Sequence, residues 1–596
     1  MSDRWAFVVA CATALGAWLT LPVPRGAAVV LVVVVVATRA PWVLAVAAFV
    51  WASASGAVAL AALHGDPRVG NFEGEVTLVG DPVPLAYGAR VDVRVEGRRY
   101  EAVTDRSMAR QMADHLAGER AVVRGSFTAR PADAPWLDAR HIAGRLRIDD
   151  IGAWREAPAV YAFANGVRRT LERGALALPY RQRALYTGLV YGDDRAQSAL
   201  LADDFRAGGL GHLLAVSGQN VAFVLAAAGP LLRRVSYRMR WPVTLFVLVL
   251  FVLVTRAEPS VLRAAVMAAI ATRAAATGRT APGVRVLALA VTALLCVDPL
   301  LVHAVGFQLS VAASLGILLG SRRVADMLRG PRVLREMLGV TIAAQVAVAP
   351  ISVLVFGGVP LASIPANLLA LPAAGPVMVW GLTGGLVAGV VGGSVAMVVQ
   401  LPMRGLVWWI AWVASHASRA PLGTLRATHV ALLGAAAAIG VLVVHLGARG
   451  RTSPIVVPLR RGALALVAVV LIAPVLAAHS PPPAAGPVAR GVWLWRNAAV
   501  VVEIDGTATS ADALGALRER DVGAIDVLVV RTATSPAAVV ARDLRTRYQP
   551  TVVWAPTLHQ IRGATTPMVG EQADAGGLVV EVLEVDDRVR VRVRAV

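Results

Sequence analysis

Long apolar runs follow one another along most of this chain, and their lengths predict helices that cross a membrane. A run of about 17–25 apolar residues is long enough to span the hydrocarbon core of a bilayer. Residues 1–66 contain three runs, and we expect a transmembrane hairpin followed by a third span, with the first run retained rather than removed as a signal peptide. The three runs are residues 5–21, 27–38 and 41–63, and further spans are expected near 211–231, 242–255, 260–276, 286–297, 300–320, 337–357, 374–398, 427–446 and 462–478. Residues 361–372 and 402–418 could be re-entrant or interfacial, although 402–418 could also cross.

Residues 70–152 follow a different pattern, in which apolar and polar positions alternate. Segments such as "RVDVRVEG" and "RAVVRGSFTAR" have the period of two that is typical of strands, and Gly or Pro separates them. Five short strands of this kind favour an OB-like β-barrel outside the membrane. Such barrels often stack nucleic-acid bases on aromatic rings, and Tyr87, Tyr100 and Phe127 are the candidates here. Residues 70–150 hold 12 arginines against 13 acidic residues, so a purely structural role is equally open.

Two further segments depart from the membrane pattern. Residues 158–180 place Val160 and Phe163 opposite charged side chains such as Arg168, which predicts an amphipathic interfacial helix. A Pro-rich linker is expected at residues 481–490, and residues 491–596 then alternate strands with helices, which predicts a small α/β domain. The expected fold class is therefore a polytopic α-helical membrane protein with an extramembrane OB-like β-barrel and a small C-terminal α/β domain.

The net charge of +20 is concentrated in the hydrophobic part of the chain. Residues 151–486 contain 29 arginines against 10 acidic residues. Most of these arginines lie in short loops, which the positive-inside rule assigns to the cytoplasm. The same parity places the OB-like and C-terminal domains on the other side of the membrane. Some of the arginines could also contact a polyanion, and the two interpretations are compatible.

Polar residues inside the apolar runs are candidates for function, because hydrophilic side chains are costly at membrane depth. They gather in the stretches "GHLLAVSGQNVAFVL" (211–225), "PSVLRAAVMA" (259–268), "DPLLVHAVGFQLSVAASLGILL" (298–319) and "FGGVPLASIPANLLALP" (356–372). Helices interrupted in this way mark pathways in transport proteins. The candidate channel-lining residues are His212, Ser217, Gly218, Gln219, Asn220, Arg263, Gln308, Ser310, Gln345 and Asn367.

A catalytic pair formed by His212 and Ser217 is a different interpretation of the first stretch. Residues five apart do not share a helical face well, and no partner acid is evident. The only two cysteines, Cys11 and Cys296, lie in separate apolar runs, so neither a disulfide framework nor a cysteine metal site is expected. No metal or other cofactor is expected.

In their order, the four quoted stretches resemble the successive signature segments of the ComEC family of competence proteins. The resemblance is strong over about residues 184–446, and the layout of the N-terminal flank agrees with it. It implies that residues 184–480 form a competence-type transmembrane channel domain, which imports single-stranded transforming DNA across the bacterial inner membrane. Many relatives have Leu-His after the Ser-Gly, where this chain has Gln219 and Asn220. The role of that family histidine therefore does not carry over.

The resemblance also implies partners and leaves alternatives. The partners would be single-stranded DNA, membrane lipids, a DNA receptor, and a cytoplasmic motor or DNA-binding proteins. A transporter of another anionic substrate on the same fold, and a membrane enzyme using His212 and Ser217, remain the alternatives.

The C-terminal segment departs from the family pattern. Many ComEC proteins end in a metallo-β-lactamase-like domain, in which a His-x-His-x-Asp-His run that binds metal follows a strand. Here "VVVEID" and "AIDVLVV" resemble the opening strands, but the chain then reads "RTATSPAA" (531–538), and the tail has only His559. We expect residues 491–596 to be a truncated metallo-β-lactamase-like domain without metal ligands and without hydrolase activity.

Overall fold

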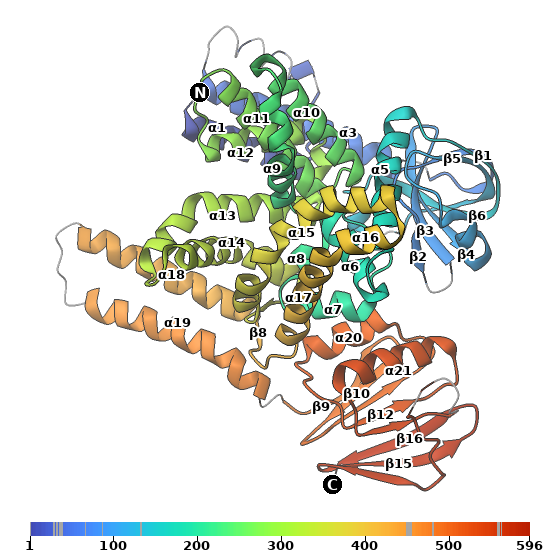
Figure 1. Cartoon of the computed structure of the whole chain (residues 1–596). Coiled ribbons are helices and arrows are strands. Elements are labelled where there is room, and N and C mark those ends of the chain that lie inside the picture. The colour runs from blue at the N-terminus through green and yellow to red at the C-terminus, as the bar shows by residue number, and fades with distance from the viewer. Residues whose placement is uncertain are drawn as a thin grey trace. The chain divides into compact units, whose positions relative to one another are not determined.

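The computed structural model describes residues 2–24, 26, 27, 30, 34, 40–65, 67–85, 88–131, 134–448, 456–479, 482–556, 561 and 563–595. These residues divide into two compact units. The first comprises Met1–Ala196, His212–Val348 and Leu371–Ile410, and the second comprises Gln197–Gly211, Ala349–Ala370 and Ala411–Val596. The predicted span at 27–38 falls mostly outside the described residues. Figure 1 shows the course of the chain from the N-terminus to the C-terminus.

Helices account for the segments that the apolar runs predict as membrane-spanning. In chain order they are α1 (Asp3–Leu19), α3 (Pro41–His64), α8 (Gly211–Leu214), α9 (Gly218–Arg234), α10 (Tyr237–Val254), α11 (Pro259–Ala276), α12 (Gly283–Val297), α13 (Val305–Met327), α14 (Arg332–Phe356), α15 (Ser363–Val391), α16 (Gly393–Val399), α17 (Leu401–Ala417), α18 (Ala427–Ala448) and α19 (Val456–His479). Two predicted boundaries are wrong. The span expected at 211–231 is broken between α8 and α9, and the span expected at 374–398 begins earlier, at Ser363.

Several of these helices are long and apolar enough to cross a membrane. Among the described residues these are α3, α13, α14, α15 and the Arg461–His479 part of α19, which makes five. Helices α16 and α17 are bent by 52° at a short break, so together they form a sixth span or a re-entrant loop. The chain is thus a multi-pass membrane protein by length and composition of its helices.

One six-stranded sheet forms the segment that alternation predicts as a barrel. Its strands are β1 (Gly70–Leu78), β2 (Val83–Leu85), β3 (Gly88–Val95), β4 (Arg98–Asp105), β5 (Arg120–Thr128) and β6 (Ile142–Arg155). The strand order is β1-β5-β6-β4-β3-β2, and β1 also pairs with β3. Strands β4 and β6 are parallel, whereas the other pairs are antiparallel. The pairings therefore run in a cycle through five strands, around a core that the short helix α4 (Arg106–Met112) also contacts.

Helix α5 (Ala159–Ala175) corresponds to the predicted amphipathic helix at 158–180, but one of its charged residues, Arg168, is buried. Val160 and Phe163 are 59% and 58% exposed, whereas Arg168 is only 2% exposed. The reason is that Arg168 finds carboxylate partners inside the first unit, which a helical projection of one segment does not reveal. The helix α6 (Tyr180–Tyr191) follows and supplies part of the same surroundings.

The C-terminal segment is a two-sheet α/β domain (Figure 1). Its strands are β9 (Ala484–Ala489), β10 (Val492–Arg496), β11 (Val500–Ile504), β12 (Val527–Val530), β13 (Val552–Trp554), β14 (Gln572–Ala575), β15 (Leu578–Val585) and β16 (Val589–Ala595), and its helices are α20 (Ser510–Glu519) and α21 (Ser535–Tyr548). The order β13-β12-β11-β10-β9 defines the first sheet, in which β11, β12 and β13 are parallel. One face of this sheet packs on α20 and α21, and the other packs on the antiparallel sheet β14-β15-β16. Because β9 pairs with β10, most of the segment predicted as a linker at 481–490 belongs to the sheet.

Within the second unit, the helix α7 (Ala199–Ala207) is fixed to this domain by charge. The buried carboxylate of Asp203 pairs with Arg518 of α20, and Asp204 pairs with Arg547 of α21 over 3.2 Å. Ala199 and Leu200 of α7 also pack on the core of the α/β domain. The segment that leads into α8 is thus anchored to the C-terminal domain.

Candidate functional site

Three of the four polar stretches meet around Arg263 of α11. The Nε–H of Arg263 donates to the hydroxyl of Ser310 on α13 over 2.8 Å, which joins the second stretch to the third. The first residue of α9, Gly218, lies against the guanidinium, and a Cβ at this position would collide with Nη2 of Arg263. The same Cβ would stand 3.2 Å from the Cβ of Ala264. Glycine at position 218 therefore allows the close approach of α9 and α11.

The start of α9 coincides with the polar residues that interrupt the predicted span. Ser217 occupies the N-cap position, but its side chain does not cap the helix. Its hydroxyl donates instead to Oδ1 of Asn220 over 3.1 Å, and the amide of Asn220 donates to the carbonyl of Leu189 in α6 over 3.4 Å. The backbone N–H groups of Gly218 and Gln219 have no hydrogen-bond partner in the described part of the chain. A helix N-terminus with open N–H groups favours an anion.

Arg263 is a buried cation without a carboxylate beside it. The residue is 6% exposed, and its Nη1 donates to the sulfur of Met267 over 2.8 Å. Met267 and Ser310 are both neutral, and no ion pair involves Arg263 among the residues that the structure describes. Burial of a guanidinium is costly unless an anion compensates it. The arginine and the helix terminus thus form a positively charged site.

Three of the remaining predicted residues do not join this site. Gln308 on α13 donates through Nε2 to the carbonyl of Val302 over 2.8 Å, which stays within its own segment. Gln345 is half-buried on α14. Asn367 belongs to the second unit, where its amide donates to the carbonyl of Ser363 one turn earlier on α15, over 2.7 Å. The predicted set therefore splits into one cluster around Arg263 and side chains outside it, of which Gln308 and Asn367 bond within their own segments.

His212 and Gln219 are exposed, on α8 and in the first turn of α9. A nucleophilic serine donates its proton to a base, whereas the hydroxyl of Ser217 donates to the amide oxygen of Asn220. This geometry does not favour a catalytic pair of His212 and Ser217.

The aromatic rings predicted to stack on bases in the β domain are core residues. Tyr100 and Phe127 are each 3% exposed, and their ring centroids are 4.6 Å apart. The prediction that they contact DNA is therefore wrong, because alternate positions on β4 and β5 point both rings into the domain's own interior. Tyr87 lies outside the described residues.

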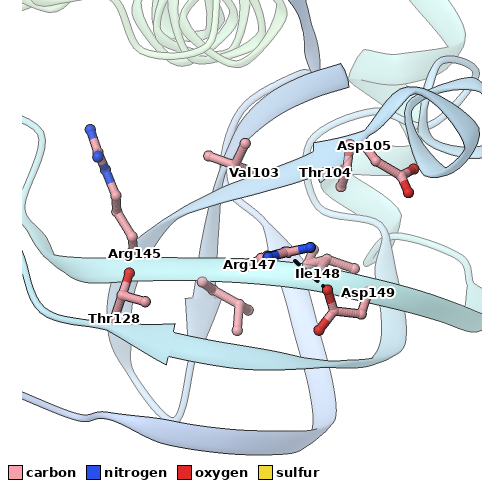
Figure 2. Close-up of a pocket in the computed structure, with 9 residues that line it drawn as sticks. Val103, Thr104, Asp105, Thr128, Arg145, Arg147, Ile148 and Asp149 are labelled. Atoms are coloured by element: carbon pink, nitrogen blue, oxygen red, sulfur yellow. Dashed lines mark ion pairs between the residues drawn. The ribbon is translucent and has the colours of Figure 1, made fainter. Parts of the chain in front are cut away.

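A cavity of about 420 Å³ lies on the outer side of the same sheet, over β4, β5 and β6 (Figure 2). Arg145 and Arg147 of β6 line it, and both are already paired with carboxylates. Arg145 bonds to Glu101 over 3.0 Å, and Arg147 pairs with Asp149 over 3.1 Å, as the dashed line in Figure 2 marks. The charges of both arginines that line this cavity are therefore compensated by carboxylates of the same sheet.

A buried ion network, which the sequence did not reveal, joins the β domain to the helices of the first unit. Asp81 in the β1–β2 loop pairs with Nη2 of Arg168 on α5 and with Nη2 of Arg256, which precedes α11, each over 2.7 Å. Arg168 also contacts Asp193 after α6 over 3.2 Å, and Arg256 donates to Asn165 over 2.9 Å. Every cation here has a carboxylate partner, unlike Arg263.

These guanidinium groups control the ionisation of Asp81. Burial alone would raise the pKa of its carboxyl, but the charges of Arg168 and Arg256 lower it from 3.8 to about 2. The N–H of Ala117 also donates to Oδ1 of Asp81 over 2.9 Å. Asp81 is therefore ionised at any physiological pH and fixes the β domain to α5 and the segment before α11.

In the C-terminal domain, a short polar loop follows β12, where the sequence comparison with the ComEC family led us to look for a metal-binding run. Thr532 and Thr534 follow β12, and the hydroxyl of Thr534 caps α21 by accepting from the N–H of Ala537. The adjacent cavity has a volume of only about 10 Å³, which is room for about one water. In the described residues, no group of three His, Cys, Asp or Glu side chains could hold a metal ion. These residues do not fit a binuclear metal centre, and His559 lies outside the described part.

Comparison with known proteins assigns the helical region to a class. Residues 189–452 match the family model described as "Competence protein". This region is therefore similar to competence proteins, and it contains α9, α11 and α13 with their shared charged site.

A particular relative agrees with this assignment. The chain is 29% identical over 166 residues to ComE operon protein 3 of Bacillus subtilis (strain 168), an alignment that covers 28% of this chain and 21% of that protein. The matched region thus spans about a fifth of the relative's length. No solved structure matches the chain.

Proposed function

We propose that this protein is an inner-membrane channel through which single-stranded DNA is imported during natural competence. The observation that carries the proposal is the meeting of Gly218, Arg263 and Ser310 at one positively charged site inside the region that is similar to competence proteins. A DNA strand carries one negative charge for each nucleotide, and a path through a bilayer must compensate that charge. An unpaired buried arginine and an uncapped helix terminus are suited to this.

The flanking domains have supporting roles in this proposal. The cyclic strand pairing with one parallel pair supports an OB-like module, which we assign a structural role on the outer face because its core aromatic rings are buried. The C-terminal α/β domain acts as a non-hydrolytic remnant, which is supported by the loop of Thr532 and Thr534 after β12. A DNA receptor outside the cell and a motor or DNA-binding protein inside it complete the pathway.

Uptake of labelled DNA by cells that lack the gene tests this function. We expect fluorescent DNA to remain outside the cytoplasm of the deletion strain and to enter again on complementation. Undiminished entry in the deletion strain would refute the proposal.

The purified protein in liposomes separates the proposed function from transport of another anion. Entry of an oligonucleotide into loaded vesicles supports the DNA channel, whereas entry of small anions alone would assign the protein to a different transport class.

A further inference from the structure

The most unusual charge in the first unit is the guanidinium of Arg263, which is enclosed by protein and lacks a counter-ion. Two of its nitrogens are engaged by neutral groups, since Nε donates to Ser310 and Nη1 donates to the sulfur of Met267. The third nitrogen, Nη2, has no partner in the described residues. Nη2 is not completely enclosed by protein atoms, so part of its surface is accessible.

Nη2 lies beside the first turn of α9, where two backbone donors are also open. Gly218 begins the 17-residue helix α9, and a Cβ on this residue would stand only 2.3 Å from Nη2. The N–H groups of Gly218 and Gln219 have no partner in the part of the chain that the structure describes, because the hydroxyl of Ser217 is directed to Asn220. Two backbone donors and the positive end of the helix dipole therefore lie next to one guanidinium nitrogen.

Neighbouring contacts hold this arrangement in place. The hydroxyl of Ser260, at the start of α11, donates to the carbonyl of Val216 just before α9, over 2.6 Å. The amide of Asn220 is tied to the carbonyl of Leu189 over 3.4 Å. These bonds fix the short segment between α8 and α9, so the position of the open donors is held by contacts with α6 and α11.

We infer that the N-terminus of α9 and Arg263 form a binding site for one phosphodiester group of a single DNA strand. The inference rests on the proposed function and deepens it, because it names the atoms that recognise the substrate. A tetrahedral phosphate can accept from several N–H donors at once, and helix N-termini and arginines are both common phosphate ligands. The contact reads only the backbone, so every nucleotide of a passing strand would be bound alike.

The role of Gly218 follows from the same geometry. A Cβ there would clash with Nη2, at 2.3 Å, and the guanidinium would have to move away from it. Gly218→Ala is therefore a variant that keeps the arginine but displaces it.

Binding of a fluorescein-labelled 12-nucleotide oligothymidylate to the full-length protein in phosphate-free detergent, followed by anisotropy over a range of salt, tests the inference. We expect Arg263→Gln to weaken binding about tenfold. We also expect the slope of log K against log salt to become shallower by about 0.7, the value for one lost phosphate contact. Gly218→Ala should shift both quantities in the same direction by less. The uncharged methylphosphonate analogue of the oligonucleotide should not distinguish wild type from Arg263→Gln.

Arg279→Gln is the matched control, because it removes the same charge from an exposed loop position after α11. We expect it to change affinity less than about twofold, as weakly coupled surface charges do. A folded Arg263→Gln protein with wild-type affinity and slope overturns the inference. If that variant does not fold, unchanged binding by Gly218→Ala overturns it instead.

Two further outcomes separate this inference from its alternatives. Wild-type protein that does not bind the oligonucleotide at all would refute the proposed function itself, whereas wild-type binding with no effect of Arg263→Gln would refute only the site. Phospholipid retained through purification by wild type but not by Arg263→Gln, with oligonucleotide affinity unchanged, would assign the site to a lipid headgroup and overturn the inference.

Discussion

Two buried arginines of the first unit, Arg168 and Arg263, differ in the charges that surround them. Arg168 is 2% exposed and contacts the carboxylates of Asp81 and Asp193. Arg263 is 6% exposed and contacts only a hydroxyl and a thioether among the described residues. A compensated buried ion pair fixes parts of a fold together, whereas an uncompensated buried cation raises the free energy of the empty protein until an anion arrives.

The difference shows how charge separates structure from function in this chain. The network around Asp81 ties the β domain to α5 and to Arg256 in the segment before α11, so its cations hold parts of the fold together. Arg263 lies beside the open N-terminus of α9, and the described residues supply no carboxylate to compensate its charge. The largest consequence of this comparison concerns stability, on which the two arginines should have opposite effects.

Arg168→Met should cause the largest loss of stability. The substitution keeps an apolar side chain of similar length but leaves Asp81 and Asp193 facing fewer cations in a buried site. Breaking a buried pair by removing one partner costs about 3–5 kcal/mol. Thermal unfolding of the detergent-solubilised protein, with loss of folded protein on expression as a second readout, measures this. An unchanged unfolding temperature would show that the network does not hold the β domain in place.

Arg263→Met should have the opposite sign in the same assay. Removal of a buried charge without a counter-ion should stabilise the DNA-free protein by about 1 kcal/mol or more, while DNA import is lost. A stability gain together with the loss of uptake is the pattern of a binding residue. Destabilisation as large as that of Arg168→Met would show instead that Arg263 is structural, and the contrast between the two arginines would disappear.

The sequence predicts the site around Arg263 but not the ion network around Arg168 and Asp81. Gly218, Arg263 and Ser310 were all identified, because polar residues within apolar runs are conspicuous and costly. The Asp81 network was not, since Asp81 and Arg256 are 175 positions apart and each resembles an ordinary loop residue. The burial of Arg168 on α5 was missed for the same reason, because a helical projection ignores partners from other segments.

Similar limits explain the errors in the flanking domains. The strand alternation of residues 70–152 located the sheet. Alternation does not show which face of a strand is buried when aromatic residues could lie on either, so Tyr100 and Phe127 were assigned to the wrong face. The short strand β9 was hidden in a Pro-rich segment whose composition is typical of a linker. Pairing with β10, a tertiary contact, decides its structure.

Acid sensitivity is a weaker test of the paired side of the comparison. The folded-state pKa of Asp81 is lowered from 3.8 to about 2 by Arg168 and Arg256, against the opposing effect of burial. Its stabilisation is therefore fully present above about pH 4 and is lost as the pH falls through about 2. The loss should amount to about 2 kcal/mol. Asp81→Asn should be less stable than wild type at pH 6, and the difference should shrink toward pH 2.

Glu503 of the C-terminal domain lies between the two extremes and gives the smallest expected effect. Its carboxylate is buried on β11, and its nearest cation, Nε of Arg531, is 3.8 Å away, so compensation is incomplete. Burial raises the pKa of Glu503 from 4.5 to about 7, although Arg531 opposes the shift. The folded state thus holds a proton that the unfolded chain releases, and stability should fall by about 1–3 kcal/mol as the pH rises from about 4.5 to about 7.

Glu503→Gln should remove this pH dependence of stability. Glu519→Gln, at the end of α20, is the control and should keep it. A pH-independent wild type would mean that Arg531 compensates the carboxylate fully, which would place Glu503 with Asp81 rather than between Asp81 and Arg263.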